Sequence, residues 1–262
     1  MVNDRRYRVR VQQRSTRPLR REQLQLHSDW RVLVLGKTGS GKSVYARWML
    51  RAWDEKRWPI LIVDQERRYT RDTGGYAEQP QDASVDHPWR LARPHWDQEQ
   101  ARVVVYEPDI PGWTDEGLAK LLAWTLTKEN TVVYFDDLSG LVDAQHLPLW
   151  LTRLWTVGRK ANVPIIAAAQ RPSNIPRVAT NQVEVVVVFR LTDEDDLKRA
   201  VSLCGGDKRV AQPLPKFLHW VYNEGDDEAR LMAPIPVSEP GATRRNGQPQ
   251  READSKQQTK AS

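Results

Sequence analysis

The chain has 262 residues, of which 39% are hydrophobic and eleven are tryptophan. This length and composition suit one α/β domain of ordinary size with tails. The single cysteine, Cys204, excludes a disulfide framework and a cysteine-based zinc site, and it favours a reducing, cytoplasmic location. No apolar run approaches the length of a membrane span, so we expect no integral membrane segment.

The positive charge is concentrated at the N-terminus. The formal net charge of the chain is +6, but residues 1–21 contain eight arginines and one acid, so this segment carries +7 and the remainder carries −1. We interpret residues 1–28 as a basic arm with a short strand at 7–11, which suits nucleic acid or another acidic surface. A solvated tail is the alternative.

The first strand predicted after the arm leads into a phosphate-binding motif. Residues 31–35 form a short apolar run, and apolar residues recur at helical spacing through 43–56. The eight residues that join them match G-x-x-x-x-G-K-[ST], the P-loop: Gly36, Lys37, Thr38, Gly39, Ser40, Gly41, Lys42 and Ser43. A chance match in a glycine-rich turn is the alternative, but a strand before and a helix after the motif favour the P-loop.

A strand, a glycine-rich loop and a helix are what phosphate binding requires. The glycines let backbone N–H groups approach the phosphates closely, and the N-terminus of the helix supplies further donors and a favourable dipole. We therefore predict ATP as the ligand, with Lys42 reaching its β- and γ-phosphates and the Ser43 hydroxyl binding Mg²⁺.

The middle of the chain alternates strands and helices. After a strand at 59–64 comes a long polar insert at 65–101, and loops of this length are often functional. A strand at 102–106 and a helix at 114–129 follow, and then an apolar strand at 131–136 that ends in two acids. The acid at the carboxyl end of such a strand points into the crevice where ligands bind.

Those two acids have the Walker B pattern of P-loop enzymes. We predict that Asp136 holds Mg²⁺, directly or through water, and that Asp137 orients or deprotonates the attacking water. A strand followed by an Asp-rich turn is the alternative interpretation, and the P-loop upstream favours the functional one.

The last part of the predicted domain brings a glutamine to the same sheet edge. A helix at 147–161 precedes a buried strand at 163–169, which delivers Gln170, and a glutamine there can hydrogen-bond a γ-phosphate or water. A strand at 183–190, a helix at 193–203 and a late strand near 217–222, in a hairpin, complete the domain. Residues 238–262 lack periodicity and are interpreted as a disordered tail.

The apolar strand runs are continuous rather than alternating. This is typical of a mainly parallel sheet that is covered by helices on both faces. We therefore expect one α/β P-loop ATPase domain, of a size that suits a motor domain, at 29–237. It lies between the arm at 1–28 and the tail at 238–262.

The order of these motifs resembles the FtsK/HerA superfamily of DNA-pumping ATPases. Ala169-Gln170-Arg171-Pro172 is similar to the "TQRP" element of that family, and 62–66 is similar to its "hhDpxgE" stretch. The resemblance covers about residues 30–225 and implies a P-loop NTPase of the RecA/ASCE type. One departure is Asp137, which stands where the family has Glu and is shorter by a methylene.

The resemblance also implies partners. A motor domain with short tails looks most like the viral genome-packaging branch, the poxvirus-type ATPases of membrane-containing phages. It implies double-stranded DNA as a partner, a homo-hexameric ring, a capsid or membrane protein at a packaging vertex, and a location in the host cytoplasm or on the virion. A cellular or plasmid HerA/FtsK-like DNA-transfer ATPase, a regulatory ATPase and a small-molecule kinase are the alternatives.

The remaining predictions concern arginines that would act on the nucleotide of a neighbouring subunit or contact DNA. In a ring, a neighbouring subunit supplies an arginine finger to the nucleotide, and Arg159 is our candidate, with Arg153 next. A solvated arginine at a helix C-terminus is the alternative for Arg159. A translocase contacts DNA phosphates without reading sequence, and the candidates for this contact are Arg67, Arg68, Arg71, Arg171 and Arg177.

Overall fold

The computed structural model describes residues 26–236 except for 66, 92–95, 97–99 and 108–114. The strand predicted at 7–11, most of the arm and the whole predicted tail lie outside the described residues. The described chain forms a nine-stranded sheet in the order β3-β4-β2-β5-β6-β1-β7-β8-β9. The strands are β1 (Arg31–Leu35), β2 (Ile60–Val63), β3 (Trp89–Arg90), β4 (Val103–Tyr106), β5 (Val132–Phe135), β6 (Ile165–Ala169), β7 (Val185–Val188), β8 (His219–Asn223) and β9 (Arg230–Met232).

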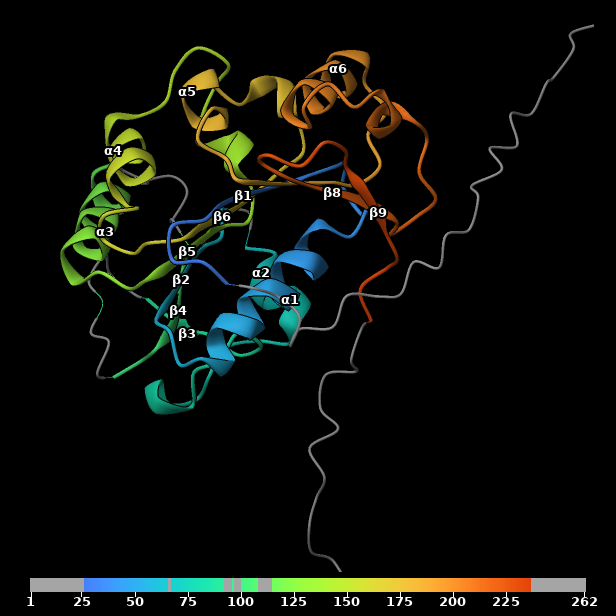
Figure 1. Ribbon diagram of the computed structural model, residues 1–262. Coiled ribbons are helices and arrows are strands. Elements are labelled where there is room, and N and C mark those ends of the chain that lie inside the picture. Colours follow the sequence, from blue (N-terminus) through green and yellow to red (C-terminus); the bar gives the residue numbers. More distant parts are fainter. Residues whose placement is uncertain (1–25, 66, 92–95, 97–99, 108–114, 237–262) are drawn as a thin grey trace, which may run out of the picture.

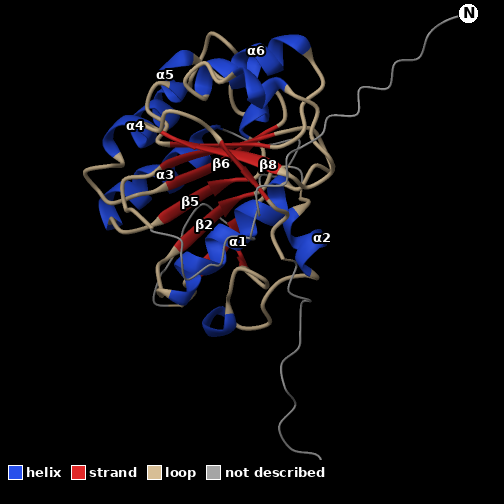
Figure 2. Cartoon of the chain, turned by 45° about the vertical axis from the view of Figure 1, so that its right-hand side comes forward, coloured by secondary structure: helices blue, strands red, loops and turns tan. Residues whose placement is uncertain are grey.

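The strands from β3 to β7 in this order are parallel, and β8 and β9 are added antiparallel at one end. Helices cover both faces, with α1 and α2 on one side and α3, α4, α5 and α6 on the other (Figures 1 and 2). Their bounds are α1 (Lys42–Glu55), α2 (Tyr69–Thr73), α3 (Asp115–Lys128), α4 (Leu149–Val157), α5 (Arg177–Thr180) and α6 (Glu194–Leu203). The predicted α/β fold is confirmed.

The central strands are buried on both faces. Every residue of β1, β2, β4, β5, β6 and β7 is buried, which is why their sequences read as continuous Val, Ile, Leu and Ala runs. Parallel register brings the ends of neighbouring strands level: Leu35 of β1 lies opposite Ala169 of β6 and Val188 of β7. The loops that follow these strands therefore share one edge of the sheet.

The predicted helix at 147–161 is shorter than expected. It begins at Leu149, after Pro148, and ends at Val157. The residue directly after the helix is Gly158, and there is no room for a side chain there. A Cβ on Gly158 would lie 2.4 Å from the Leu154 carbonyl oxygen and 3.1 Å from a guanidinium nitrogen of Arg31. Its predicted stripe is buried at Leu151, Leu154 and Trp155 and half-buried at Leu147 and Trp150.

The predicted insert at 65–101 has structure of its own. It contains α2, a 3₁₀ turn at Pro80–Asp82 and strand β3, which extends the sheet beside β4.

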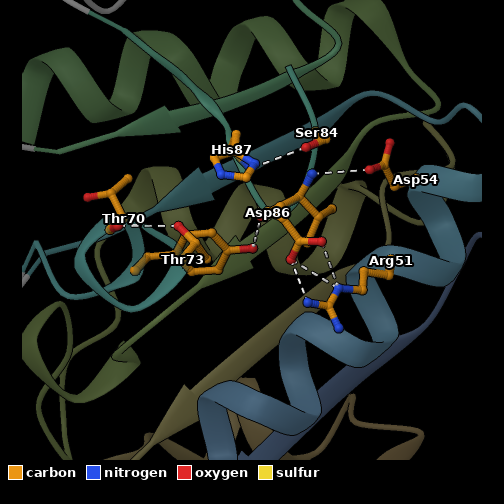
Figure 3. A network of polar contacts seen from close by, with 9 residues as sticks. Arg51, Asp54, Thr70, Thr73, Ser84, Asp86 and His87 are labelled. Carbon is orange, nitrogen blue, oxygen red and sulfur yellow. Dashed lines mark hydrogen bonds and ion pairs between the residues drawn. The ribbon is translucent and has the colours of Figure 1, made fainter. Parts of the chain in front are cut away.

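Polar contacts tie the insert to α1 (Figure 3). Arg51 of α1 pairs with Asp86, 2.6 Å between Nη2 and Oδ1, and Asp54 accepts a hydrogen bond from the backbone N–H of Val85 at 3.1 Å. The buried Tyr69 hydroxyl donates to the Val85 carbonyl at 2.9 Å. The helix that follows the P-loop and the insert are therefore held as one unit.

None of the helices in the described part of the chain has the length and apolar character needed to cross a membrane.

Candidate nucleotide-binding site

The P-loop turns sharply between β1 and α1. At Gly36, an added Cβ would lie 2.7 Å from the Cβ of Phe189 and 2.8 Å from the Ser40 hydroxyl. Gly41 has φ +116° in the left-handed region and caps α1, and its Cβ would lie 3.0 Å from the Phe189 ring. Glycine is needed at both positions for steric reasons, and the loop can therefore pass close to a ligand.

Lys42 and Ser43 begin α1 directly after this turn. Lys42 is buried except for 8% of its surface, and its Nζ donates to the carbonyl oxygen of Lys37 at 3.1 Å. The lysine is thus folded over its own loop, with its charge at the N-terminus of a 14-residue helix. This is where backbone donors and the helix dipole favour an anion.

The two acids follow β5 at the same edge. The Asp136 carboxylate accepts a hydrogen bond from the Tyr134 hydroxyl at 2.5 Å, and burial, together with the neighbouring charge of Asp137, raises the pKa of Asp136. Asp137 accepts from the backbone N–H of Ser139 at 2.9 Å, so it also caps the following 3₁₀ turn.

Gln170 connects the P-loop with the second acid. Strand β6, which carries it, lies between β5 and β1. The Thr38 hydroxyl donates to Gln170 Oε1 at 2.8 Å, and Gln170 Nε2 donates to Asp137 Oδ2 at 2.9 Å. The sequence places these groups at one edge, and the structure adds a direct chain of hydrogen bonds from Thr38 to Asp137.

A third acid at this edge had no assigned role in the sequence. Asp64, which follows β2, is fully buried and accepts hydrogen bonds from the backbone N–H groups of Arg68 at 3.1 Å and Tyr69 at 2.7 Å. Burial, and secondarily the charge of Asp136, raises the pKa of Asp64 to about 6. The resemblance of 62–66 to a family element was the signal for this residue; Glu66 lies outside the described residues.

The P-loop, the two acids after β5 and Gln170 surround a cavity of about 350 Å³. It is lined by Thr38, Gly39, Gly41, Lys42, Ser43, Val44, Arg47, Arg68, Asp72, Asp136, Asp137, Gln170 and Phe217. Of the predicted catalytic residues, Lys42, Asp137 and Gln170 thus gather here with Thr38, Gly39, Gly41 and Ser43 of the P-loop, whereas Arg159 does not. Sequence reasoning missed Arg47, Asp72 and Phe217, which come from a helix, the insert and a loop far along the chain.

A second cavity of about 490 Å³ is larger but has different chemistry. It lies between α1 and the β7–β9 end of the sheet, and its lining includes Trp30, Tyr45, Met49 and Ile235. The lysine, hydroxyl and acid groups needed for phosphate chemistry line the smaller cavity, so the smaller cavity is the candidate site.

The residues around the smaller cavity fit a magnesium ion. Mg²⁺ prefers hard oxygen ligands and often takes one or two from the protein and the rest from phosphates and water. The Ser43 hydroxyl and the Asp136 carboxylate line the same cavity, and a buried carboxylate with a raised pKa is stabilised by a cation. The described residues contain no cluster of three or more His, Cys, Asp or Glu that would hold a metal without such help.

The predicted arginine-finger candidate lies elsewhere. Arg159 sits past the end of α4, where it donates to the Gln182 carbonyl at 2.7 Å and forms an ion pair with Glu184. These partners precede β7, so Arg159 is at the amino edge of the sheet, opposite the P-loop. Arg153 on α4 is exposed.

The predicted DNA-contacting arginines divide into three groups. Arg68 is exposed and also lines the candidate site. Arg171 pairs with Asp196 at 2.8 Å and with Asp193 at 3.3 Å. The side chains of Arg67, Arg71 and Arg177 are exposed.

Together, the parallel sheet, the P-loop, the paired acids and the bridging glutamine define a P-loop ATPase. A model of the central domain of helicase HerA matches residues 29–161, half of the chain, and the chain belongs to this family.

The chain is similar to one curated protein in sequence and to solved structures in fold. The chain is 28% identical over 218 residues to the DNA packaging ATPase P9 of Enterobacteria phage PRD1, a match that covers 80% of this chain and 88% of P9. The fold is similar to that of the genome packaging NTPase B204 of Sulfolobus turreted icosahedral virus 2 bound to AMP, with a TM-score of 0.65, 14% identity, and coverage of 80% of this chain and all of B204. It is also similar to the cytoplasmic domain of the type VII secretion ATPase EccC of Thermomonospora curvata, with a TM-score of 0.55, 12% identity, and coverage of 82% of this chain and 25% of that one.

Proposed function

We propose that this protein is a genome-packaging ATPase that uses ATP hydrolysis to move double-stranded DNA into a viral capsid. The relationship to the phage PRD1 packaging ATPase supports the cargo, and the HerA-type domain supports ATP hydrolysis. The observation that carries the assignment is the Thr38–Gln170–Asp137 chain, because it links the phosphate loop to an acid that can handle water.

The residues of the site have distinct roles in this proposal. Lys42 and the loop backbone bind the β- and γ-phosphates, and Asp137 accepts a proton from the attacking water. Gln170 contacts both the loop and Asp137, so a change in the loop on hydrolysis would be transmitted to Asp137 through one amide. Mg²⁺, held by Ser43 and Asp136, would neutralise phosphate charge.

A ring of identical subunits, expected to be a hexamer, would place a neighbour's arginine at this site. Arg159 was the sequence-based candidate, but its ion pair with Glu184 and its hydrogen bond to the Gln182 carbonyl favour a structural role. We therefore assign the finger to Arg153, which is exposed on α4. A capsid or membrane protein at the packaging vertex completes the proposed assembly.

DNA contact in this proposal is electrostatic. Residues 1–21 of the arm carry +7, and Arg67, Arg71 and Arg177 present exposed charge on the folded body. Contacts of this kind bind phosphates without reading sequence, and they weaken steeply as salt rises.

The ATPase rate with and without long duplex DNA tests the proposal. We expect DNA to stimulate turnover, equally for duplexes of unrelated sequence and less at high salt. Stimulation would separate a DNA motor from a small-molecule kinase and from a regulatory ATPase. ATP turnover that is indifferent to DNA at every salt concentration would contradict the motor function while leaving the ATPase intact.

A further inference from the structure

Phe217 has a backbone conformation that its side chain disfavours. Its φ is +70°, and among the described non-glycine residues with positive φ it is the only aromatic one. For a bulky residue, this left-handed conformation is a genuine outlier, and such outliers gather at ligand sites, where the surrounding structure enforces them. A reason for keeping a phenyl ring at this position is therefore needed.

The surroundings of Phe217 hold its backbone in place. The next strand, β8, begins with His219, which is 1% exposed and stacks on Phe189 with ring centroids 4.8 Å apart. Tyr45 of α1 packs edge-on against both rings. Burial lowers the pKa of His219 to about 4, so this histidine is neutral and belongs to the core. The aromatic cluster fixes the start of β8 and with it the loop that precedes the strand.

The ring itself is directed into the nucleotide site. Phe217 is 43% exposed and lines the same cavity as Lys42, Ser43 and Asp136. It also lies against the P-loop, since a Cβ on Gly41 would be 3.3 Å from its Cδ1. The Lys216 ammonium lies 4.8 Å from the ring centroid and thus occupies one face. An exposed phenyl ring beside a phosphate-binding loop is a stacking surface rather than part of the core.

The geometry points to Phe217 as the nucleobase subsite of this protein. A purine base of a nucleoside triphosphate would stack on the ring face opposite Lys216 while the phosphates lie on the loop. Stacking does not depend on the hydrogen-bonding edge of the base, so this contact would hold ATP and GTP alike. The inference rests on the proposed nucleotide function of the P-loop and adds how the base end is recognised.

The sharpest test replaces Phe217 with glycine, because glycine removes the ring and relieves the backbone at once. We expect Phe217→Gly to bind ATPγS and GTPγS about tenfold more weakly, the size of a lost base–aromatic stack. Inorganic tripolyphosphate, which has no base, should bind as it does to the wild type. Thermal unfolding without ligand should move up by about 2–4 °C, and Phe217→Trp should restore nucleotide affinity. Calorimetric titration measures each affinity.

Arg57→Gly is the matched control. Arg57 has a similar φ of +64° and is exposed after the end of α1, so relief of its backbone should stabilise the fold without changing nucleotide affinity. Unchanged ATPγS affinity in Phe217→Gly would overturn the subsite. So would equal weakening of ATPγS and tripolyphosphate, which would mean that Phe217 only shapes the P-loop. Lys42→Ala should lose both ligands; if it keeps both, the P-loop assignment fails instead.

Discussion

The two edges of the sheet bring different charged groups together: acids lie beside one another at the carboxyl edge, whereas groups of opposite charge meet at the amino edge. At the carboxyl edge, the buried Asp64 and the half-buried Asp136 lie beside one another, and their pKa values are raised. At the amino edge, Arg31 is fully buried, but its guanidinium donates to the carbonyl oxygens of Trp155 and Val163 at 3.1 Å each. Glu184 there accepts from the backbone N–H of Arg31 at 2.7 Å and pairs with Arg159.

This difference distinguishes the carboxyl edge, which holds the candidate site, from the amino edge, which has a structural role. At the amino edge burial also shifts pKa values, lowering that of Arg31 to about 10 and raising that of Glu184, but groups of opposite charge lie together there and partner one another within the fold. The acids at the carboxyl edge pay a desolvation cost that a bound cation would remove. A polar cluster that is costly without a ligand is typical of a functional site, and the same comparison predicts which substitutions change activity and which change stability.

Loss of the P-loop lysine should have the largest effect. Lys42→Ala removes the positive charge that meets the phosphates, and we expect ATP hydrolysis to fall below detection. Unfolding in urea should show that the variant is folded. Lys120→Ala is the control, because Lys120 is an exposed lysine on α3 that pairs with Glu116 at 2.7 Å. Turnover near that of the wild type in Lys42→Ala would rule out the P-loop assignment.

Arg153 and Arg159 lie close together in the sequence, but we expect their substitutions to differ: the first should change activity and the second should change stability. Arg153→Ala is expected to lower turnover by about 10³-fold, the smaller end of the range for an arginine finger, with little change in stability. Mixing it with Lys42→Ala protein should restore part of the activity if the finger acts between subunits.

Arg159→Ala should do the reverse. It leaves Glu184 without its ion-pair partner, and because the arginine is 38% exposed we expect a loss of only about 1 kcal/mol in the free energy of unfolding. Turnover per folded subunit should remain unchanged. A collapse of turnover in Arg159→Ala, with Arg153→Ala unaffected, would return the finger to Arg159.

Asp137→Asn should uncouple binding from hydrolysis. The asparagine keeps the size of the side chain and an oxygen for the Ser139 N–H, but it cannot take a proton from water. We expect ATPγS affinity within about twofold of the wild type and turnover lower by about 10²–10⁴-fold. Loss of nucleotide binding instead would show that Asp137 is the metal ligand and that the roles of the two acids are reversed.

The sequence predicted the sheet well because the signal was simple. Continuous apolar runs mark strands that are buried on both faces. Polar residues after several of these runs, such as Asp136 and Gln170, mark the carboxyl edge. The insert was harder to predict, because α2 and β3 are short and are held by contacts with α1 such as Arg51–Asp86, which join residues 35 positions apart.

Two features depended on tertiary structure alone. In the sequence, Arg31 is an ordinary polar residue at the start of a strand. Only the fold shows that its guanidinium donates to the carbonyl groups of Trp155 in α4 and of Val163, which precedes β6. Phe217 reads as an apolar residue of a late strand, yet it precedes β8 with a positive φ that an aromatic side chain disfavours. Such conflicts between local preference and global structure tend to occur at functional sites.

The smallest expected effect concerns the pH dependence of stability. Asp64 has a pKa of about 6 in the folded chain against an ordinary value of 3.8, so between these pH values the folded state holds more protons than the unfolded state. Its contribution therefore weakens the fold as the pH rises through this window. Asp64→Asn carries no such charge.

Urea unfolding of both proteins at pH 4, 5, 6 and 7.5 isolates this effect. In the variant, the backbone N–H of Arg68 or of Tyr69 loses its acceptor, which lowers the free energy of unfolding by a similar amount at every pH. Removal of the carboxylate charge raises the free energy of unfolding, and this gain grows with pH. We expect the stability of Asp64→Asn relative to the wild type to improve by about 2 kcal/mol from pH 4 to 7.5, because one pKa unit corresponds to about 1.4 kcal/mol. A difference that does not vary with pH would show that Asp64 is ionised without penalty. The contrast between the two edges would then rest on Asp136 alone.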